Sequence, residues 1–126
     1  MKTRILVVED DRYISQLLRA VLVRHQFEVF SARDEAGFQK ELSSNPEILL
    51  MDIMLGDRNG VDIYEETREK GLVDSKLPVI FLSASIKAIG KIRGKTGNEY
   101  TALAKPFEVS ELVSTLRAAL PTAASA

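Results

Sequence analysis

The chain has 126 residues, a formal net charge of −1 from 17 Lys and Arg against 18 Asp and Glu, and 45% hydrophobic residues. This composition is typical of one globular domain and argues against both a disordered chain and a general nucleic-acid binder. No cysteine is present, which excludes a disulfide scaffold, a cysteine-ligated zinc site and thiol catalysis. No apolar run approaches the roughly 20 residues of a membrane-spanning helix, so we expect a soluble, cytoplasmic protein.

Strand and helix patterns alternate from the start of the chain. Residues 5–8 are wholly apolar and rich in β-branched side chains, which predicts a strand buried on both faces. Asp11 is placed to cap the helix that follows. The apolar positions of that helix recur at helical spacing and are Ile14, Leu17, Leu18, Val21 and Leu22. Residues 27–32 predict a second strand, and Asp34 can cap a second helix that ends before Pro46.

The second half of the chain continues this alternation. The expected strands are residues 48–51, 79–82 and 102–104, and the expected helices are residues 61–70 and 109–120. Such alternation implies βαβ units with right-handed crossovers and a parallel sheet covered by helices on both faces. We expect one domain over residues 1–120, with a flexible tail or the beginning of a linker at residues 121–126.

Residues 86–97 show the weakest pattern. One face of a helix there would be formed by Ile86, Ile89 and Ile92. The same stretch also holds Gly90, Gly94 and Gly97. Each glycine inside a helix costs about 1 kcal/mol relative to alanine, so the fourth of five expected helices should be short or frayed.

Polar side chains gather where the predicted strands end, and ligands of open parallel sheets bind at that edge. These residues are Glu9, Asp10, Asp11, Asp52, Ser83 and Lys105. Two carboxylates about 4 Å apart repel by about 4 kcal/mol at an effective dielectric of 20, a cost that a cation relieves. A set of oxygen ligands suits Mg²⁺ or Mn²⁺. A metal ion beside an aspartate, a hydroxyl and a lysine is suited to phosphoryl transfer.

Each of these residues also has an ordinary structural interpretation. Carboxylates are favourable at a helix N-terminus, which is the interpretation we prefer for Asp11. Ser83 could simply complete a turn, and Lys105 could be a solvated lysine. The combination of Asp52 with acidic residues after the first strand favours a metal site over these alternatives.

At these positions the sequence resembles the receiver domains of bacterial two-component response regulators, over roughly residues 3–120. The motifs that carry the resemblance are ILVVEDD at residues 5–11, LMDIML at 50–55, PVIFLSA at 78–84 and KPF at 105–107. The resemblance implies a doubly wound, flavodoxin-like, five-stranded parallel sheet in the order 2-1-3-4-5. It also implies a phosphorylation-dependent switch, whose partners are a histidine kinase or phosphotransfer protein and an unknown output partner.

The resemblance implies a role for each site residue. Asp52 would accept the phosphoryl group, and Asp10 and Asp52 would bind Mg²⁺ or Mn²⁺. The backbone carbonyl of Met54 would be a third metal ligand, with Glu9 acting through water. Phosphoryl oxygens would be contacted by Ser83 and by Lys105, whose bond to the following proline is expected to be cis. The output would be a changed surface near residues 84–107.

Two departures from the family pattern keep other functions open. The family usually has Tyr or Phe three residues before the lysine, where this chain has Ala102, and the nearest aromatic residue is Tyr100. Gly56 stands where proline is common. One alternative is a pseudo-receiver, which binds a partner without phosphorylation. The other is an aspartyl-phosphate hydrolase, although Met54 occupies the position of the second acid that such enzymes commonly use.

Overall fold

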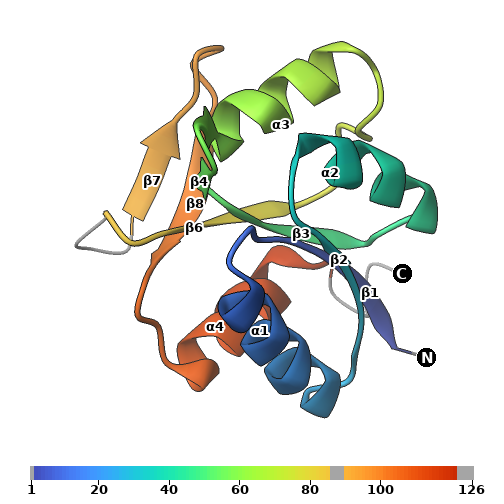
Figure 1. Cartoon of the computed structure of the whole chain (residues 1–126), viewed down its shortest axis with the longest axis vertical. Helices are drawn as coiled ribbons and strands as arrows, with labels where there is room; N and C mark the ends of the chain where they lie inside the picture. Colours follow the sequence, from blue (N-terminus) through green and yellow to red (C-terminus); the bar gives the residue numbers. More distant parts are fainter. Residues whose placement is uncertain (1, 86–89, 122–126) are drawn as a thin grey trace.

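The computed structural model describes residues 2–85 and 90–121 and shows a central sheet between two layers of helices (Figure 1). The strand order is β2-β1-β3-β6-β8-β7. The strands are β1 (Thr3–Val8), β2 (Phe27–Ala32), β3 (Ile48–Asp52), β6 (Val79–Ser83), β7 (Gly90–Arg93) and β8 (Glu99–Ala104). All neighbouring pairs are parallel except the last, in which β7 runs antiparallel to β8. The expected parallel order 2-1-3-4-5 is therefore confirmed, with β8 as the fifth strand.

Two helices cover each face of the sheet. They are α1 (Arg12–Arg24) and α4 (Val109–Ala119) on one face, and α2 (Glu35–Glu41) and α3 (Gly60–Glu69) on the other (Figure 1). A 3₁₀ turn, η1 (Leu42–Ser44), follows α2, and a small hairpin of β4 (Met54–Leu55) and β5 (Arg58–Asn59) precedes α3. Within residues 2–85 and 90–121, no helix is both long and apolar enough to cross a membrane.

Apolar side chains on both faces of the sheet hold the layers together. All five residues of β3 are buried, and adjacent residues point to opposite faces. Leu49 packs in the cluster that contains Phe38 of α2, whereas Leu50 packs in the cluster that contains Leu18 of α1. Each fully buried leucine contributes about 1.5–3 kcal/mol, which explains why the central strands have unbroken apolar sequences.

The helices α1 and α2 begin at the caps that the sequence predicts. The carboxylate of Asp11 accepts a hydrogen bond from the amide of Ile14, and that of Asp34 accepts one from the amide of Gly37. The side chain of Asn59 caps α3 in the same way. Such caps satisfy amide groups that have no partner within the helix.

The expected helix over residues 86–97 is wrong where the chain is described, because residues 90–93 form β7; residues 86–89 lie outside the described residues. Exposure alternates along Lys91, Ile92 and Arg93, which is a strand period rather than a helical one. Gly97, with φ of 86°, supplies the turn to β8. The described chain consequently has four α-helices instead of five, and β8 begins at Glu99 instead of residue 102.

Candidate functional site

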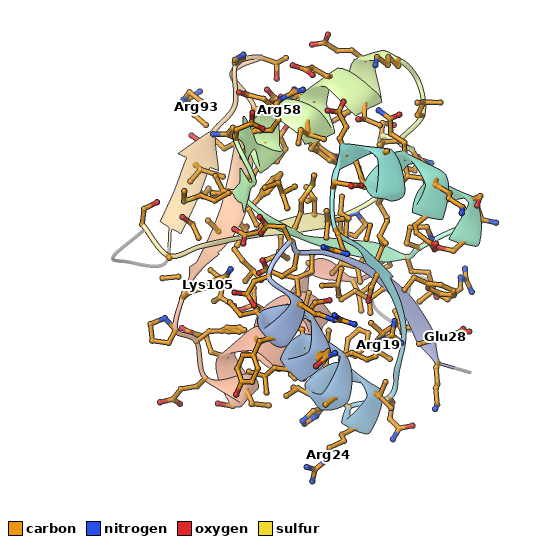
Figure 2. The ribbon with its side chains drawn as sticks, in the orientation of Figure 1. Arg19, Arg24, Glu28, Arg58, Arg93 and Lys105 are labelled. Carbon is orange, nitrogen blue, oxygen red and sulfur yellow. The ribbon has the colours of Figure 1, made fainter. Side chains whose placement is uncertain are left out.

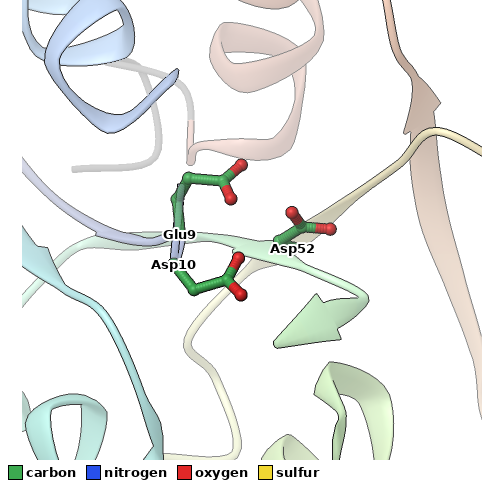
Figure 3. A group of neighbouring side chains, drawn as sticks. All are labelled: Glu9, Asp10 and Asp52. Carbon is green, nitrogen blue, oxygen red and sulfur yellow. The ribbon is translucent and has the colours of Figure 1, made fainter. Parts of the chain in front are cut away.

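Three carboxylates meet at the carboxyl edge of the sheet (Figure 3). Glu9 and Asp10 follow β1, and Asp52 is the last residue of β3, the parallel neighbour of β1. One oxygen of each carboxylate lies within 4.8 Å of the others. Glu9 is 1% exposed and Asp52 is 4% exposed, whereas Asp10 is exposed. The cluster is therefore buried at its base and open to solvent at Asp10.

Backbone amides hold these carboxylates in place. The Oε2 atom of Glu9 accepts a hydrogen bond from the amide of Asp11 at 3.1 Å. The Oδ2 atom of Asp10 accepts one from the amide of Gly56 at 2.9 Å, and the Oδ1 atom of Asp52 accepts one from the amide of Met54 at 3.0 Å. Gly56 has φ of 62°, a conformation that proline cannot adopt, so the family's usual proline would not fit this turn.

Lys105 joins this cluster from the end of β8. Its Nζ donates hydrogen bonds of 2.7 Å to Oε1 of Glu9 and to Oδ2 of Asp52. Its backbone amide donates to the carbonyl of Ser83, which ties the segment to β6, and the Lys105–Pro106 bond is cis, as the resemblance implies. Burial by itself lowers the pKa of Lys105, but the hydrogen bonds to Asp52 and Glu9 outweigh it and raise that pKa. The lysine is therefore charged.

Glu9 has an unusual pKa because of its surroundings. Burial, together with the neighbouring Asp52 carboxylate, outweighs the hydrogen bond from Lys105 and raises the pKa of Glu9 from 4.5 to about 7. The carboxyl is thus only about half ionised at neutral pH. A bound cation would favour its ionised form.

The donor set fits a divalent cation. Three carboxylates against one ammonium leave two uncompensated negative charges when all groups are ionised. The ligands are oxygen atoms, and the exposure of Asp10 leaves room for the water molecules that Mg²⁺ retains. The structure thus brings together Glu9, Asp10, Asp52 and Lys105, while their individual roles, and that of the Met54 carbonyl, stay predictions.

Ser83 ends β6, the parallel neighbour of β3, and is fully buried. Among the described residues, its side chain makes no hydrogen bond to the carboxylates. Its Oγ lies 2.9 Å from Oγ of Ser85 and accepts a hydrogen bond from the Ser85 amide at 3.1 Å. A groove of about 240 Å³ runs from these two serines to β7, where Ile92 and Arg93 line it. The hydroxyl of Ser83 therefore faces the loop after β6.

The aromatic residue of β8 lies two positions before the one usual in the family. Ala102 is fully buried between Phe81 of β6 and Gly90 of β7. Tyr100, on the same face of β8, packs edge to face against Phe81 and Tyr64, with ring centroids 5.4 Å and 5.5 Å away. An aromatic ring two residues earlier on the same face of β8 thus packs in the core, with its hydroxyl turned toward α3.

That hydroxyl donates a 2.9 Å hydrogen bond to Glu65, a buried carboxylate that the sequence analysis did not single out. Glu65 also accepts from the hydroxyl of Thr96 at 2.6 Å and from its amide at 3.4 Å. Burial alone would raise the pKa of Glu65, but these hydrogen bonds from Thr96 and Tyr100 lower it. Sequence carried no signal for this contact, because it joins α3 to a turn that we had expected to be helical.

The fold and this acidic site define the class of protein. The chain matches the response regulator receiver domain over residues 5–117 and belongs to that family. Receiver domains are the phosphorylation-dependent switches of two-component signalling, and in this chain three carboxylates and a lysine lie together at the carboxyl edge of the sheet.

Several curated proteins are similar to this chain. It is 34% identical to the transcriptional regulatory protein DltR of Streptococcus agalactiae, over 90% of this chain and 50% of that protein. It is 33% identical to the transcriptional regulatory protein CpxR of Klebsiella pneumoniae, over 93% of this chain and 49% of that protein. The chain therefore spans about half the length of the curated relatives it matches.

Solved structures support the fold alone. The chemotaxis protein CheY4 of Vibrio cholerae superposes with a TM-score of 0.80 at 21% identity, covering 95% of this chain and all of that one. The receiver domain of Francisella response regulator 1452 gives a TM-score of 0.77 at 24% identity, covering 93% of this chain and 95% of that one.

Proposed function

We propose that Asp52 accepts a phosphoryl group from a phosphohistidine donor, either a histidine kinase or a phosphotransfer protein. One observation carries this proposal: the buried carboxylate of Asp52 lies within 4.8 Å of two further carboxylates and is hydrogen-bonded to a lysine. In this transfer an oxygen of Asp52 forms a bond to phosphorus as the phosphorus–nitrogen bond of the donor breaks. The imidazole leaves with the electron pair.

Each residue of the cluster supports one part of this transfer. Glu9, Asp10, Asp52 and the Met54 carbonyl would hold Mg²⁺ or Mn²⁺, which neutralises charge on the transferring group when bound. Lys105 already donates to Asp52 and can keep one donor on a phosphoryl oxygen. Ser83 would exchange its contact with Ser85 for one to another phosphoryl oxygen. That exchange would carry the signal toward residues 84–107.

A donor protein can approach over exposed apolar side chains on α1, which begins two residues after Asp10, and on α4. Tyr13 and Leu17 on α1 are 75% and 50% exposed, and Val109 at the start of α4 is 45% exposed. Leu17 and Val109 line one small groove between these helices. We expect Leu17→Asp to slow transfer from a protein donor about tenfold and to leave uptake from acetyl phosphate unchanged.

The chain would act as a switch and not as an enzyme with turnover. Its relatives include proteins named transcriptional regulators, but it spans about half of their length. We therefore propose no direct contact with nucleic acid for residues 1–120, and an output through a partner or a further domain. A cytoplasmic location stays a prediction.

A thermal melt with Mg²⁺ and beryllofluoride, a phosphoryl mimic, tests the proposal. A ligand that binds only the folded protein at a hundred times its dissociation constant stabilises it by about 2.7 kcal/mol. We expect Mg²⁺ with beryllofluoride to raise the melting temperature of the wild type and of the Asp57→Asn control, and to leave that of Asp52→Asn unchanged. An unmoved wild type would instead favour the pseudo-receiver alternative, which Ala102 supports. Steady phosphate release from a phosphoester would favour the hydrolase.

A further inference from the structure

The outermost strand of the sheet, β7, has one edge with no pairing partner among the described residues. Among the described strands it pairs with β8 alone, and it lies at the periphery of the molecule (Figure 1). Exposed edges can accept a further strand, and several protein families bind peptides in this way. We propose that β7 is a docking strand for an extended acidic segment of a partner protein.

Hydrogen bonding within the hairpin determines which backbone groups face outward. The amide of Gly94 donates to the carbonyl of Asn98 at 2.9 Å, so these two residues form a hydrogen-bonded pair. In an antiparallel ladder such pairs alternate with non-bonded ones. Ile92 therefore bonds to Tyr100 of β8, whereas the N–H and C=O groups of Lys91 and Arg93 point away from the sheet. These are the groups to which an added strand would bond.

The hairpin is held rigidly enough to serve as a template. Glu65 of α3 accepts hydrogen bonds from Thr96 in the turn and from Tyr100 in β8. Ile92 packs against the apolar cluster under α3, and the guanidinium of Arg93 donates to the carbonyl of Gly97 at 2.8 Å. An edge that is already ordered costs a partner little conformational entropy on binding.

The charge along the edge selects the partner. Lys91 and Arg93 lie on one face of β7, with side chains that are 69% and 65% exposed (Arg93 is labelled in Figure 2). One carboxylate, Glu99, faces both cations from β8, at 4.0 Å and 2.9 Å. This face therefore keeps one positive charge in excess. Acidic side chains at alternate positions of an added strand would lie directly across from it.

A second copy of this chain and a nucleic acid fit the edge less well. Pairing β7 with another β7 through its outward groups places Lys91 or Arg93 opposite Lys91 or Arg93, so cations face cations in each of these registers. A phosphate backbone offers only acceptors, whereas this edge presents C=O acceptors as well as N–H donors. A peptide backbone matches both.

The position of β7 relative to Ser83 suggests how docking on this strand could contribute to signalling. The groove of about 240 Å³ that Ile92 and Arg93 line also reaches Ser83. A segment on β7 would therefore bind a strand that lines the same groove as Ser83, the residue that is proposed to respond to a phosphoryl group. Docking itself depends on the edge alone, so Asp52→Asn should still bind, and failure of the proposed phosphorylation would not affect this test.

The first experiment titrates the full chain with a capped Glu-Val-Glu-Val-Glu peptide and follows backbone amide signals by NMR. We expect the largest shifts, and slowed hydrogen exchange, at the amides of Lys91 and Arg93. A Lys-Val-Lys-Val-Lys peptide should bind at least about tenfold more weakly, and added salt should weaken the acidic peptide.

A matched pair of variants separates backbone pairing from charge. Lys91→Pro removes an N–H that faces outward and leaves the bonds between β7 and β8, while Lys91→Ala removes the same charge and keeps that N–H. We expect Lys91→Pro to bind at least about tenfold more weakly than Lys91→Ala. Slow exchange of the Ile92 amide shows that the hairpin is intact in each variant.

Three outcomes would overturn the proposal. One is the absence of a saturable shift at millimolar acidic peptide in the wild type. Another is equal binding of the acidic and basic peptides. The third is equal binding to Lys91→Pro and Lys91→Ala with the Ile92 amide protected in both. The peptide comparison needs no variant, so it decides the matter even if Lys91→Pro does not fold.

Discussion

A buried glutamate lies in the acid cluster, and another, on α3, anchors the β7–β8 hairpin; the pKa values of these two glutamates shift in opposite directions. Glu9 and Glu65 are 1% and 4% exposed. Yet burial and the nearby Asp52 raise the pKa of Glu9 to about 7, whereas hydrogen bonds from Thr96 and Tyr100 overcome burial and lower the pKa of Glu65. Burial alone therefore does not set the charge of a carboxyl. The neighbours decide it.

This difference separates a site that needs a ligand from one that does not. Glu9 and Asp52 share one cation, Lys105, so their cluster has excess negative charge when both are ionised, and a bound cation can neutralise it. The Oε2 atom of Glu65 accepts from the hydroxyls of Thr96 and Tyr100, and its Oε1 atom accepts from the Thr96 amide, so this carboxylate needs no further ligand. We infer that the first region is built for binding and the second for holding the hairpin on α3.

Gly94→Ala should have the largest effect on this comparison. A Cβ atom at Gly94 would overlap the carboxylate of Glu65, which would have to leave its donors. We expect the free energy of unfolding to fall by about 2–4 kcal/mol in urea denaturation. In a Glu65→Ala background the same change should cost less than about 1 kcal/mol. Equal costs in both backgrounds would contradict the contact.

Replacing each glutamate by glutamine should give unequal effects. Glu65→Gln should lower the free energy of unfolding by about 2 kcal/mol, because its nitrogen would face the Thr96 amide, another donor, and its neutral carbonyl accepts the two hydroxyls more weakly than a carboxylate does. Glu9→Gln, without Mg²⁺ and at about pH 8, should cost less than about 1 kcal/mol, because it removes a buried charge beside Asp52. Denaturation of both variants checks this, and losses of the same size would disprove the distinction.

Binding of Mg²⁺ should depend on the proton on Glu9. With a pKa of about 7, Glu9 is mostly protonated near pH 6 and mostly ionised near pH 8. Since the metal competes with this proton, the affinity for Mg²⁺ should fall about tenfold as the pH is lowered from 8 to 6, and calorimetric titration measures it. Glu9→Gln should show a flatter profile. A wild-type affinity that does not change with pH would rule out the link.

Without metal, the two glutamates should affect stability in opposite pH ranges. The folded-state pKa of Glu9 is raised from 4.5 to about 7, so its contribution is full below 4.5 and is lost as pH rises through about 7. The folded-state pKa of Glu65 is lowered, so its contribution is present above 4.5 and is lost as pH falls through that lowered value. In melting curves, Glu9→Gln should lack the loss of stability as the pH rises through about 7. Glu65→Gln should lack the loss of stability as the pH falls.

Tyr100→Phe should have the smallest effect. It removes one hydrogen bond to Glu65 and keeps the ring that packs against Phe81 and Tyr64. We expect a loss of about 1 kcal/mol in the free energy of unfolding. A much larger loss would mean that the hydroxyl, and not the ring, holds the hairpin in place.

Local patterns in the sequence were sufficient for the parallel strands of the sheet and for the carboxylate edge. Apolar runs at residues 5–8 and 48–51 predicted buried parallel strands, and the acids directly after them had to lie at the same edge. Caps at Asp11 and Asp34 were equally local. Such features depend on neighbours in sequence or on a rule that holds for every parallel sheet, so they need no knowledge of the particular tertiary contacts.

Only the tertiary structure decided the region after Ser83. The spacing of Ile86, Ile89 and Ile92 suggested a helix, but residues 90–93 add to the sheet beside β8, where Ile92 reaches the core. The contact of Glu65 with Thr96 and Tyr100 spans more than thirty residues and requires Gly94 beneath the carboxylate. The sequence by itself thus determined the parallel sheet and its acidic edge, because those follow from local apolar periodicity. The hairpin, its anchor and its open edge came from packing between distant segments, which no local pattern records.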